Sequence, residues 1–144
     1  MTRLQAVFWD VDGTLADTEL NGHRPAFNQA FSDCGLDWYW NEELYSELLR
    51  IPGGRQRMQC YAEQVGAPID QALLDRLRRS KQQHYLKIAS SGTVTLRPGV
   101  SRLLQELNSA AVQQWIVTSS GRASVEALLQ SLPSGLAGIF KGMV

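Results

Sequence analysis

Two aspartates separated by one residue, Asp10 and Asp12, are the side chains whose type and spacing most directly suggest chemistry. They follow a short apolar run at 6–9 and precede Gly13, which lets the chain turn sharply and brings both carboxylates to one place. Neighbouring carboxylates repel each other unless a cation or a proton lies between them. One can attack phosphorus as a nucleophile, while the other donates and accepts a proton. The alternative is a turn with two solvated aspartates, since Asp and Gly are common in turns.

A second polar segment, Thr118-Ser119-Ser120, follows the apolar run 115–117. Hydroxyl groups and backbone amides at a strand-to-helix turn form an anion site, which the helix N-terminus favours. Thr118 and Ser119 are therefore candidate phosphate-binding residues. The alternative is simple N-capping of the next helix by Ser119 or Ser120.

Two strands must position these segments. The runs 6–9 and 115–117 are typical of strands buried on both faces, and a turn and a helical pattern follow each of them. This arrangement predicts an α/β fold with a parallel sheet, in which ligands bind beyond the carboxyl ends of the strands. We therefore expect the two aspartates and the hydroxyl-bearing residues in one crevice. A third strand is expected to begin at about 138–140.

The sequence between these strands is helical in pattern from about residue 20 to residue 90. Asn41 is a predicted N-cap, with Glu42 and Glu43 in the first helical turn. The predicted organisation is a partial core formed by 1–18 and 91–144, with 19–90 as a helical cap. Further apolar positions that recur at helical spacing are Ala26, Phe27, Ala30, Phe31, Leu73, Leu77, Tyr85, Val100, Leu103, Leu104, Leu107, Val125, Leu128, Leu129 and Leu132.

Charge is balanced over the whole chain but unevenly distributed. Fourteen basic residues match fourteen acidic ones, and this argues against a nucleic-acid partner held by bulk positive charge. Residues 1–49 hold nine acids against two bases, whereas 50–87 hold eight bases against three acids. The first region is suited to a cation and the second to an anion, although solvated helix faces are the alternative for any single residue.

The apolar runs are too short for a membrane span, and the first residues do not resemble a signal peptide. Cys34 and Cys60 form neither a disulfide framework nor a metal-ligand spacing. Two reduced thiols indicate a cytoplasmic protein.

The string Asp-x-Asp-Gly-Thr-Leu at 10–15 resembles the first motif of the haloacid dehalogenase (HAD) superfamily, in its phosphatase branch, and 118–120 resembles the second motif. The resemblance implies that Asp10 is the nucleophile, Asp12 the general acid and base, and Thr118 a ligand of the transferring phosphoryl group. It also implies Mg²⁺ as cofactor, held by Asp10, by Asp12 through its backbone carbonyl, and by a later acidic residue. A second aspartate favours phosphoryl transfer over dehalogenation.

Later segments, Thr18-Glu19, Gly53-Gly54-Arg55 and Leu96-Arg97-Pro98-Gly99 among them, resemble the CbbY-like subfamily, whose characterised members dephosphorylate xylulose bisphosphate. This implies a HAD Rossmann-like sheet with an inserted α-helical cap, a small phosphate ester as ligand with a pentulose bisphosphate favoured, and a monomer in the cytoplasm or, in a plant, the plastid stroma.

Four cap residues receive roles from the same resemblance. Glu19 and His23 are expected to face the sugar phosphate. Arg55, where relatives often have Lys, is expected to bind the distal phosphate, together with Arg57. The alternatives are an ordinary surface histidine at position 23 and a solvated helix charge at position 57. The aromatic residues Trp38, Tyr39 and Trp40 are assigned to packing of the cap.

The sequence departs from the family pattern after Thr118. The family's later Lys and acidic pair have only Lys141 and Glu126 as counterparts there, and neither follows the expected pattern. We therefore expect an N-terminal piece of a longer phosphatase, with weak or no turnover by this chain alone. The alternatives are a non-catalytic sugar-phosphate-binding module or inactive fragment, and a β-phosphoglucomutase-like mutase.

Overall fold

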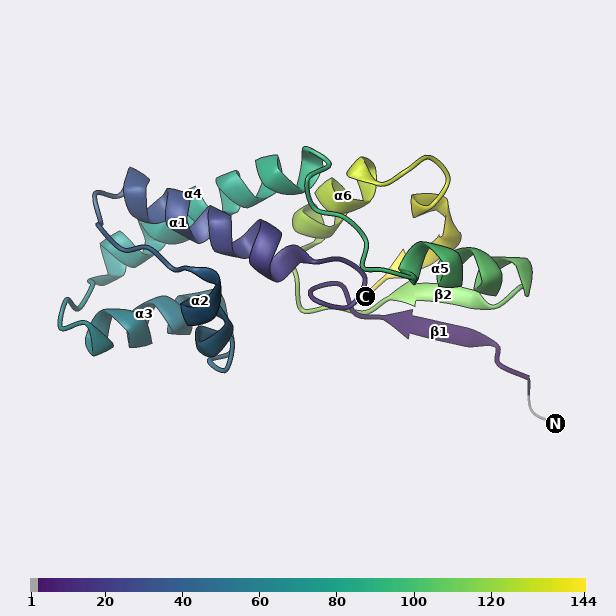
Figure 1. The fold of residues 1–144 in the computed structure, drawn as a ribbon, viewed down its shortest axis with the longest axis horizontal. Helices are drawn as coiled ribbons and strands as arrows, with labels where there is room; N and C mark the ends of the chain where they lie inside the picture. Colours follow the sequence, from purple (N-terminus) through teal and green to yellow (C-terminus); the bar gives the residue numbers. More distant parts are fainter. Residues whose placement is uncertain (1–2) are drawn as a thin grey trace. The chain divides into compact units, whose positions relative to one another are not determined.

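The computed structural model describes residues 3–144, which form two compact units (Figure 1). The core unit comprises residues up to Gly22 together with Leu86–Val144, and the cap unit comprises His23–Tyr85. These limits lie a few residues inside the range 19–90 that the sequence analysis assigns to the cap, and the functional division at 19–90 stays a prediction. In residues 3–144, no helix has both the length and the apolar character needed to cross a membrane.

A parallel sheet forms the centre of the core unit, and this confirms the predicted α/β class. Its strand order is β1-β2-β3, so the two strands that are far apart in sequence are direct neighbours. Trp9 pairs with Ile116 at the carboxyl end of the sheet. The strands are β1 (Ala6–Trp9), β2 (Gln113–Ile116) and β3 (Phe140–Met143).

Helices α5 (Val100–Ser109) and α6 (Arg122–Ser131) also belong to the core unit. Leu104 of α5 is fully buried, whereas Leu103, on the predicted apolar face, is 42% exposed. The buried Gln114 side chain joins the helix to the sheet: its Oε1 accepts a bond from Trp9 Nε1 (3.0 Å), and its Nε2 donates to the Leu104 carbonyl (2.9 Å). This amide therefore connects β1, β2 and α5.

On the other face of the sheet, two aromatic residues lie at paired positions of neighbouring strands. Phe8 pairs with Trp115, and Trp115 pairs with Gly142. Phe8 is 67% exposed, so the prediction that β1 is buried on both faces is wrong. A Cβ atom on Gly142 would lie 2.7 Å from Trp115 Cζ3, so this glycine leaves the space that the indole ring occupies.

The inserted segment begins with a π-helical turn at Glu19–His23 and continues through four α-helices. Asn41 Oδ1 accepts from the Leu44 amide (2.8 Å), which confirms the predicted N-cap. Asp70 Oδ1 accepts from the Leu73 amide (2.7 Å) near the start of the longest helix. The helices are α1 (Arg24–Asp33), α2 (Glu42–Leu48), α3 (Gly54–Gln64) and α4 (Gln71–Ser90), the last of which ends in the core unit.

Aromatic packing holds the cap unit together. Trp40 is fully buried, with ring centroids 4.8 Å from Phe31 and 5.0 Å from Phe27. Asn28 fixes the backbone of Trp40 from both sides, accepting from its amide (2.8 Å) and donating to its carbonyl (2.9 Å). The packing role predicted for the aromatic triplet is confirmed for Trp40 and for Trp38, whose ring centroid lies 5.4 Å from that of Phe31, whereas Tyr39 is 66% exposed.

Candidate active site

Asp10 is the first residue after β1, and its carboxylate is exposed at the carboxyl end of the sheet. Thr14 Oγ1 donates to Asp10 Oδ2 at 3.2 Å. The intervening turn is closed by the carbonyl of Val11, which accepts from the amides of Thr14 (3.1 Å), Leu15 (3.0 Å) and Ala16 (3.2 Å). Gly13 has φ of +73°, a conformation that side chains with a Cβ rarely adopt. The turn therefore places Thr14 against Asp10.

The carboxylate of Asp12 accepts hydrogen bonds from two hydroxyl groups. Thr18 Oγ1 donates to Oδ1 at 2.6 Å, and Ser120 Oγ donates to Oδ2. Thr18 is fully buried, so its hydroxyl is a fixed donor. Ser120 follows β2, which means that the loops after both strands meet at Asp12. Because a hydroxyl group can accept as well as donate, Thr18 and Ser120 can hold this side chain in either protonation state.

The segment after β2 is organised around Thr118. Its Oγ1 accepts from the Ser120 amide (3.1 Å), and its own amide donates to the Val144 carbonyl (3.2 Å). Ser119 is exposed, and Ser120 is the residue of this segment that contacts Asp12. Helix α6 takes Gly121 as its N-cap, so the alternative in which Ser119 or Ser120 caps the helix is wrong. The sequence analysis did not select Ser120 as a site residue. Thr118, Ser119 and Ser120 are all polar and adjacent, so their pattern does not show which of them points toward Asp12.

Two carboxylates at one strand end fit part of the ligand set that Mg²⁺ prefers. This ion is commonly bound by one or two carboxylates together with phosphate and water oxygens. The Asp10 carboxylate and the backbone carbonyl of Asp12 would be two of its ligands. Within residues 3–144, no group of three or more His, Cys, Asp or Glu is placed to hold a metal ion. The described residues thus offer part of the oxygen ligand set proposed for the ion.

Among the cap residues, His23 contacts other protein side chains closely. Its Nδ1 lies 2.9 Å from Lys81 Nζ, and its ring stacks on Tyr85 with centroids 4.1 Å apart. An ammonium group offers only donors, so Nδ1 is the acceptor in this contact. Glu19 opens the same π-helical turn and is half-buried. His23 therefore orders Lys81, an interaction not anticipated from the sequence.

Arg57 lies in the interior of the cap unit, in contrast to the expectation that it faces a substrate. It is 7% exposed, and it donates to the carbonyls of Leu48 (3.0 Å) and Ile51 (3.1 Å). Its guanidinium also lies over the Tyr45 ring, 5.4 Å from the centroid. These contacts satisfy the buried charge and the carbonyls together. Neither the substrate-binding role nor the alternative of a solvated helix charge describes this environment.

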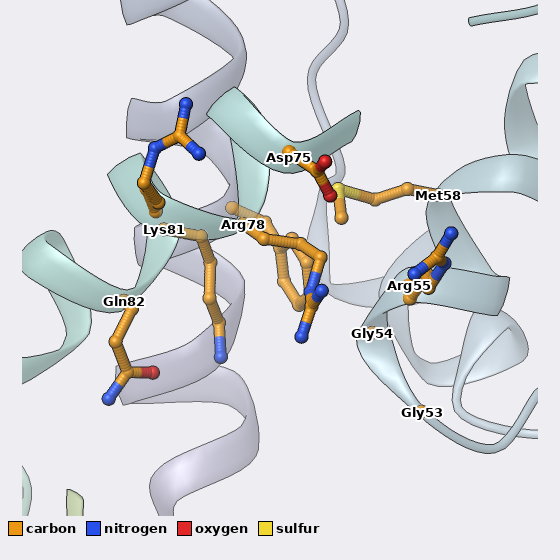
Figure 2. A pocket seen from close by; sticks show the side chains of 10 residues that line it. Gly53, Gly54, Arg55, Met58, Asp75, Arg78, Lys81 and Gln82 are labelled. Carbon is orange, nitrogen blue, oxygen red and sulfur yellow. The ribbon is translucent and has the colours of Figure 1, made fainter. Parts of the chain in front are cut away.

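A cavity of about 630 Å³ lies within the cap unit and collects basic side chains (Figure 2). Arg55, Arg78 and Lys81 line it, and Asp75 is its acidic member. Arg55 Nη2 donates to Gln71 Oε1 (2.5 Å), and Gln71 Nε2 donates to Asp75 Oδ1 (2.9 Å). The excess of cations makes the cavity suited to an anion. The excess of bases in 50–87 was the sequence signal for Arg78 and Lys81.

The ammonium group of Lys81, which lines this cavity, lies over two aromatic rings. Its Nζ lies 5.0 Å from the Phe27 ring centroid and 5.1 Å from that of Tyr85. Together with the contact to His23, these rings fix the ammonium group while leaving it on the cavity wall.

Comparison with known proteins adds independent findings. The family model of the haloacid dehalogenase-like hydrolases matches residues 4–144. CbbY of Rhodobacter capsulatus is 43% identical over 135 residues, which cover 94% of this chain and 59% of that protein. The chain thus spans about six-tenths of the length of this relative.

Solved structures agree with the sequence matches. An aspartate-to-asparagine variant of CbbY from Rhodobacter sphaeroides, in complex with xylulose 1,5-bisphosphate, superimposes with a TM-score of 0.82 at 31% identity, covering 98% of this chain and 63% of that one. CbbY from the same organism in complex with phosphate gives a TM-score of 0.82 at 32% identity, with the same coverage. The chain belongs to the haloacid dehalogenase-like hydrolase family.

Proposed function

We propose that the chain carries the nucleophile and the cap of a magnesium-dependent phosphatase that acts on a small sugar phosphate, with a pentulose bisphosphate as the favoured substrate. The observation that carries this proposal is the meeting of Asp12 with Ser120. It brings the end of β1, with its two carboxylates, to the hydroxyl-bearing loop after β2.

Asp10 is the proposed nucleophile because it is the more exposed carboxylate of the pair. One of its oxygens forms a bond to phosphorus while the bond from phosphorus to the sugar oxygen breaks. The leaving oxygen takes a proton from the carboxylic acid form of Asp12. Asp12 then takes a proton from water, whose oxygen bonds to phosphorus as the aspartyl-phosphate bond breaks. Inorganic phosphate leaves, and both aspartates return to their starting forms.

Thr18 and Ser120 would orient Asp12 in both steps, since each donates to one of its oxygens. Thr118 and Ser119 would contact the phosphoryl oxygens through hydroxyl or amide groups. Mg²⁺, when bound by Asp10 and Asp12, supplies positive charge that offsets the repulsion between carboxylates and phosphoryl oxygens.

The cap cavity supports the preference for a substrate with two phosphate groups. Arg55, Arg78 and Lys81 give it a positive charge that suits a phosphate group. Glu19 and His23 are the other residues proposed to face the sugar phosphate, with His23 also ordering Lys81. A bisphosphate carries two groups of the kind that the core and cap units are separately equipped to bind. The xylulose 1,5-bisphosphate complex of the Rhodobacter sphaeroides relative is consistent with this choice.

The test is phosphate release from xylulose 1,5-bisphosphate, with Mg²⁺ and with EDTA, by the wild-type chain and by Asp10→Asn. We expect slow, Mg²⁺-dependent release that is lost in the variant. A rearranged sugar phosphate without net phosphate release would contradict the phosphatase and favour the mutase. Saturable calorimetric binding with no release on long incubation would instead favour a non-catalytic binding module.

A further inference from the structure

We propose that Arg97 is a positioning residue for Asp10, acting through the peptide group between Gly13 and Thr14. Arg97 Nη1 donates to the carbonyl oxygen of Gly13 at 2.9 Å, across 84 residues of sequence. The bond joins the segment between α4 and α5 to the turn that carries both aspartates. The inference rests on the proposed role of Asp10 as nucleophile.

The connection from Arg97 to Asp10 consists of one peptide plane and one side chain. The Gly13 carbonyl and the Thr14 amide belong to the same rigid peptide group, so fixing one fixes the other. That amide donates to the Val11 carbonyl (3.1 Å), while Thr14 Oγ1 donates to Asp10 Oδ2 (3.2 Å). A rotation of this peptide group would therefore move the hydroxyl that orients Asp10.

Gly13 makes this peptide group susceptible to rotation. Its φ of +73° lies in the region that glycine enters readily, and a Cβ added there would meet nothing within 4 Å beyond its chain neighbours. The amides on both sides of Gly13 are bonded within the turn, the Gly13 amide to the Ala16 carbonyl (2.9 Å) and the Thr14 amide to the Val11 carbonyl, and Arg97 adds a restraint on the Gly13 carbonyl from outside the turn. The charged guanidinium supplies a strong hydrogen bond to the carbonyl.

The backbone of Arg97 is itself held against the same turn. Its amide donates to the Leu15 carbonyl (2.9 Å), and the Asp17 amide donates to the Thr95 carbonyl (3.2 Å). An antiparallel bridge joins Ala16 to Leu96. The backbone of Arg97 is therefore hydrogen-bonded to the turn, and its guanidinium group lies within reach of the Gly13 carbonyl.

The experiment compares Arg97→Gln and Arg97→Lys with Arg102→Gln in the full chain. Arg102 is a matched control because it is an exposed arginine of the core unit that pairs with Glu106 (2.9 Å). Hydrogen–deuterium exchange at residues 13–16 is the first measurement. We expect exchange there to rise about tenfold in Arg97→Gln, less in Arg97→Lys, and not at all in Arg102→Gln, with β1 and β2 unchanged.

The second measurement is the hydrolysis of p-nitrophenyl phosphate with Mg²⁺, with and without added guanidinium ion. We expect Arg97→Gln to lower kcat with little change in KM, and millimolar guanidinium to restore part of it. Exchange that stays at the wild-type level in Arg97→Gln would overturn the proposal, as would a lower kcat without faster exchange. If the wild-type chain has no turnover, as a piece of a longer phosphatase can behave, the exchange measurement alone decides whether Arg97 holds the turn, and the role of Asp10 is tested separately.

Discussion

Charged side chains of the core unit and of the cap unit have different kinds of contact partner. In the core unit, the carboxylate of Asp12 is enclosed by hydroxyl donors from two loops. In the cap unit, cations lie against rings and carbonyls: Arg57 is used inside the fold, whereas Lys81 is held by rings and His23 at the edge of a cavity. In both units, the contacts that a charged side chain makes within the fold determine whether it is available to a ligand.

The largest effect that this comparison predicts concerns the exposed carboxylate of the core unit. Asp10→Asn should lower Mg²⁺-dependent phosphate release by about a thousandfold or more, because the amide is a poor nucleophile. Its thermal unfolding should be nearly unchanged, since the carboxylate is exposed. Asp37→Asn, a change of an exposed cap carboxylate, is the matched control. Comparable release by both variants would remove the core unit's role in the proposed reaction.

The contrast within the cap unit gives the second prediction. Arg57→Met should lower the free energy of unfolding by about 3 kcal/mol, because two buried carbonyls lose a charged donor. Arg55→Met should change it by less than about 0.5 kcal/mol, since Arg55 is exposed. Arg55→Met should instead weaken phosphate binding. Urea unfolding and calorimetry with inorganic phosphate measure the two effects, and equal stability losses would show that the two arginines do not differ as described.

A third prediction distinguishes the adjacent serines of the core unit. Ser120→Ala should lower phosphate release about tenfold, because Asp12 loses one of its two hydroxyl donors. Ser119→Ala should have a smaller effect if Ser119 contributes its backbone amide. Initial rates at saturating substrate are the measurement. A larger loss in Ser119→Ala would mean that the hydroxyl of Ser119 is the more important group.

The smallest predicted effect compares two glycines that face aromatic rings. In the cap unit, a Cβ at Gly54 would lie 2.9 Å from Cζ of the buried Phe27 ring, so Gly54→Ala should cost about 1 kcal/mol even after the gain in helix propensity. In the core unit, Gly142→Ala should cost less, although its contact is closer, because the half-buried Trp115 ring has room to move. Chemical denaturation of both variants checks the order, and the reverse order would indicate that Trp115 is held as firmly as Phe27.

Local patterns predicted much of the fold. The apolar run at 6–9 is β1, and Ala26, Phe27, Ala30 and Phe31 form the buried face of α1. Predictions of which side of a helix is buried were less accurate where a change of one residue along the sequence selects a different face. On α4 the buried position is Leu74, where the sequence favoured Leu73, because the pattern there fits more than one helix face.

The candidate site was predictable where it follows from one turn or from the pairing of the two parallel strands, which brings Ser120 to Asp12. The proximity of Asp10, Asp12 and Gly13 follows from adjacent residues in one turn. The burial of Arg57 and the contact between His23 and Lys81 depend on which helices pack together, and neither is encoded in the spacing of a motif. Arg97 likewise acts on a glycine 84 residues away.

The buried amide of Gln114 has a consequence for how accurately the two distant strands align. A parallel pair that slipped by one residue would turn every side chain to the opposite face, and the indole of Trp9 would lose the acceptor that Gln114 provides. Mispairing would also leave a polar amide without partners in an apolar interior, an error that carries a free-energy penalty of its own. The hydrogen bonds of Gln114 thus favour the register of β1 and β2 in which Asp12 and Ser120 are close enough to form a hydrogen bond.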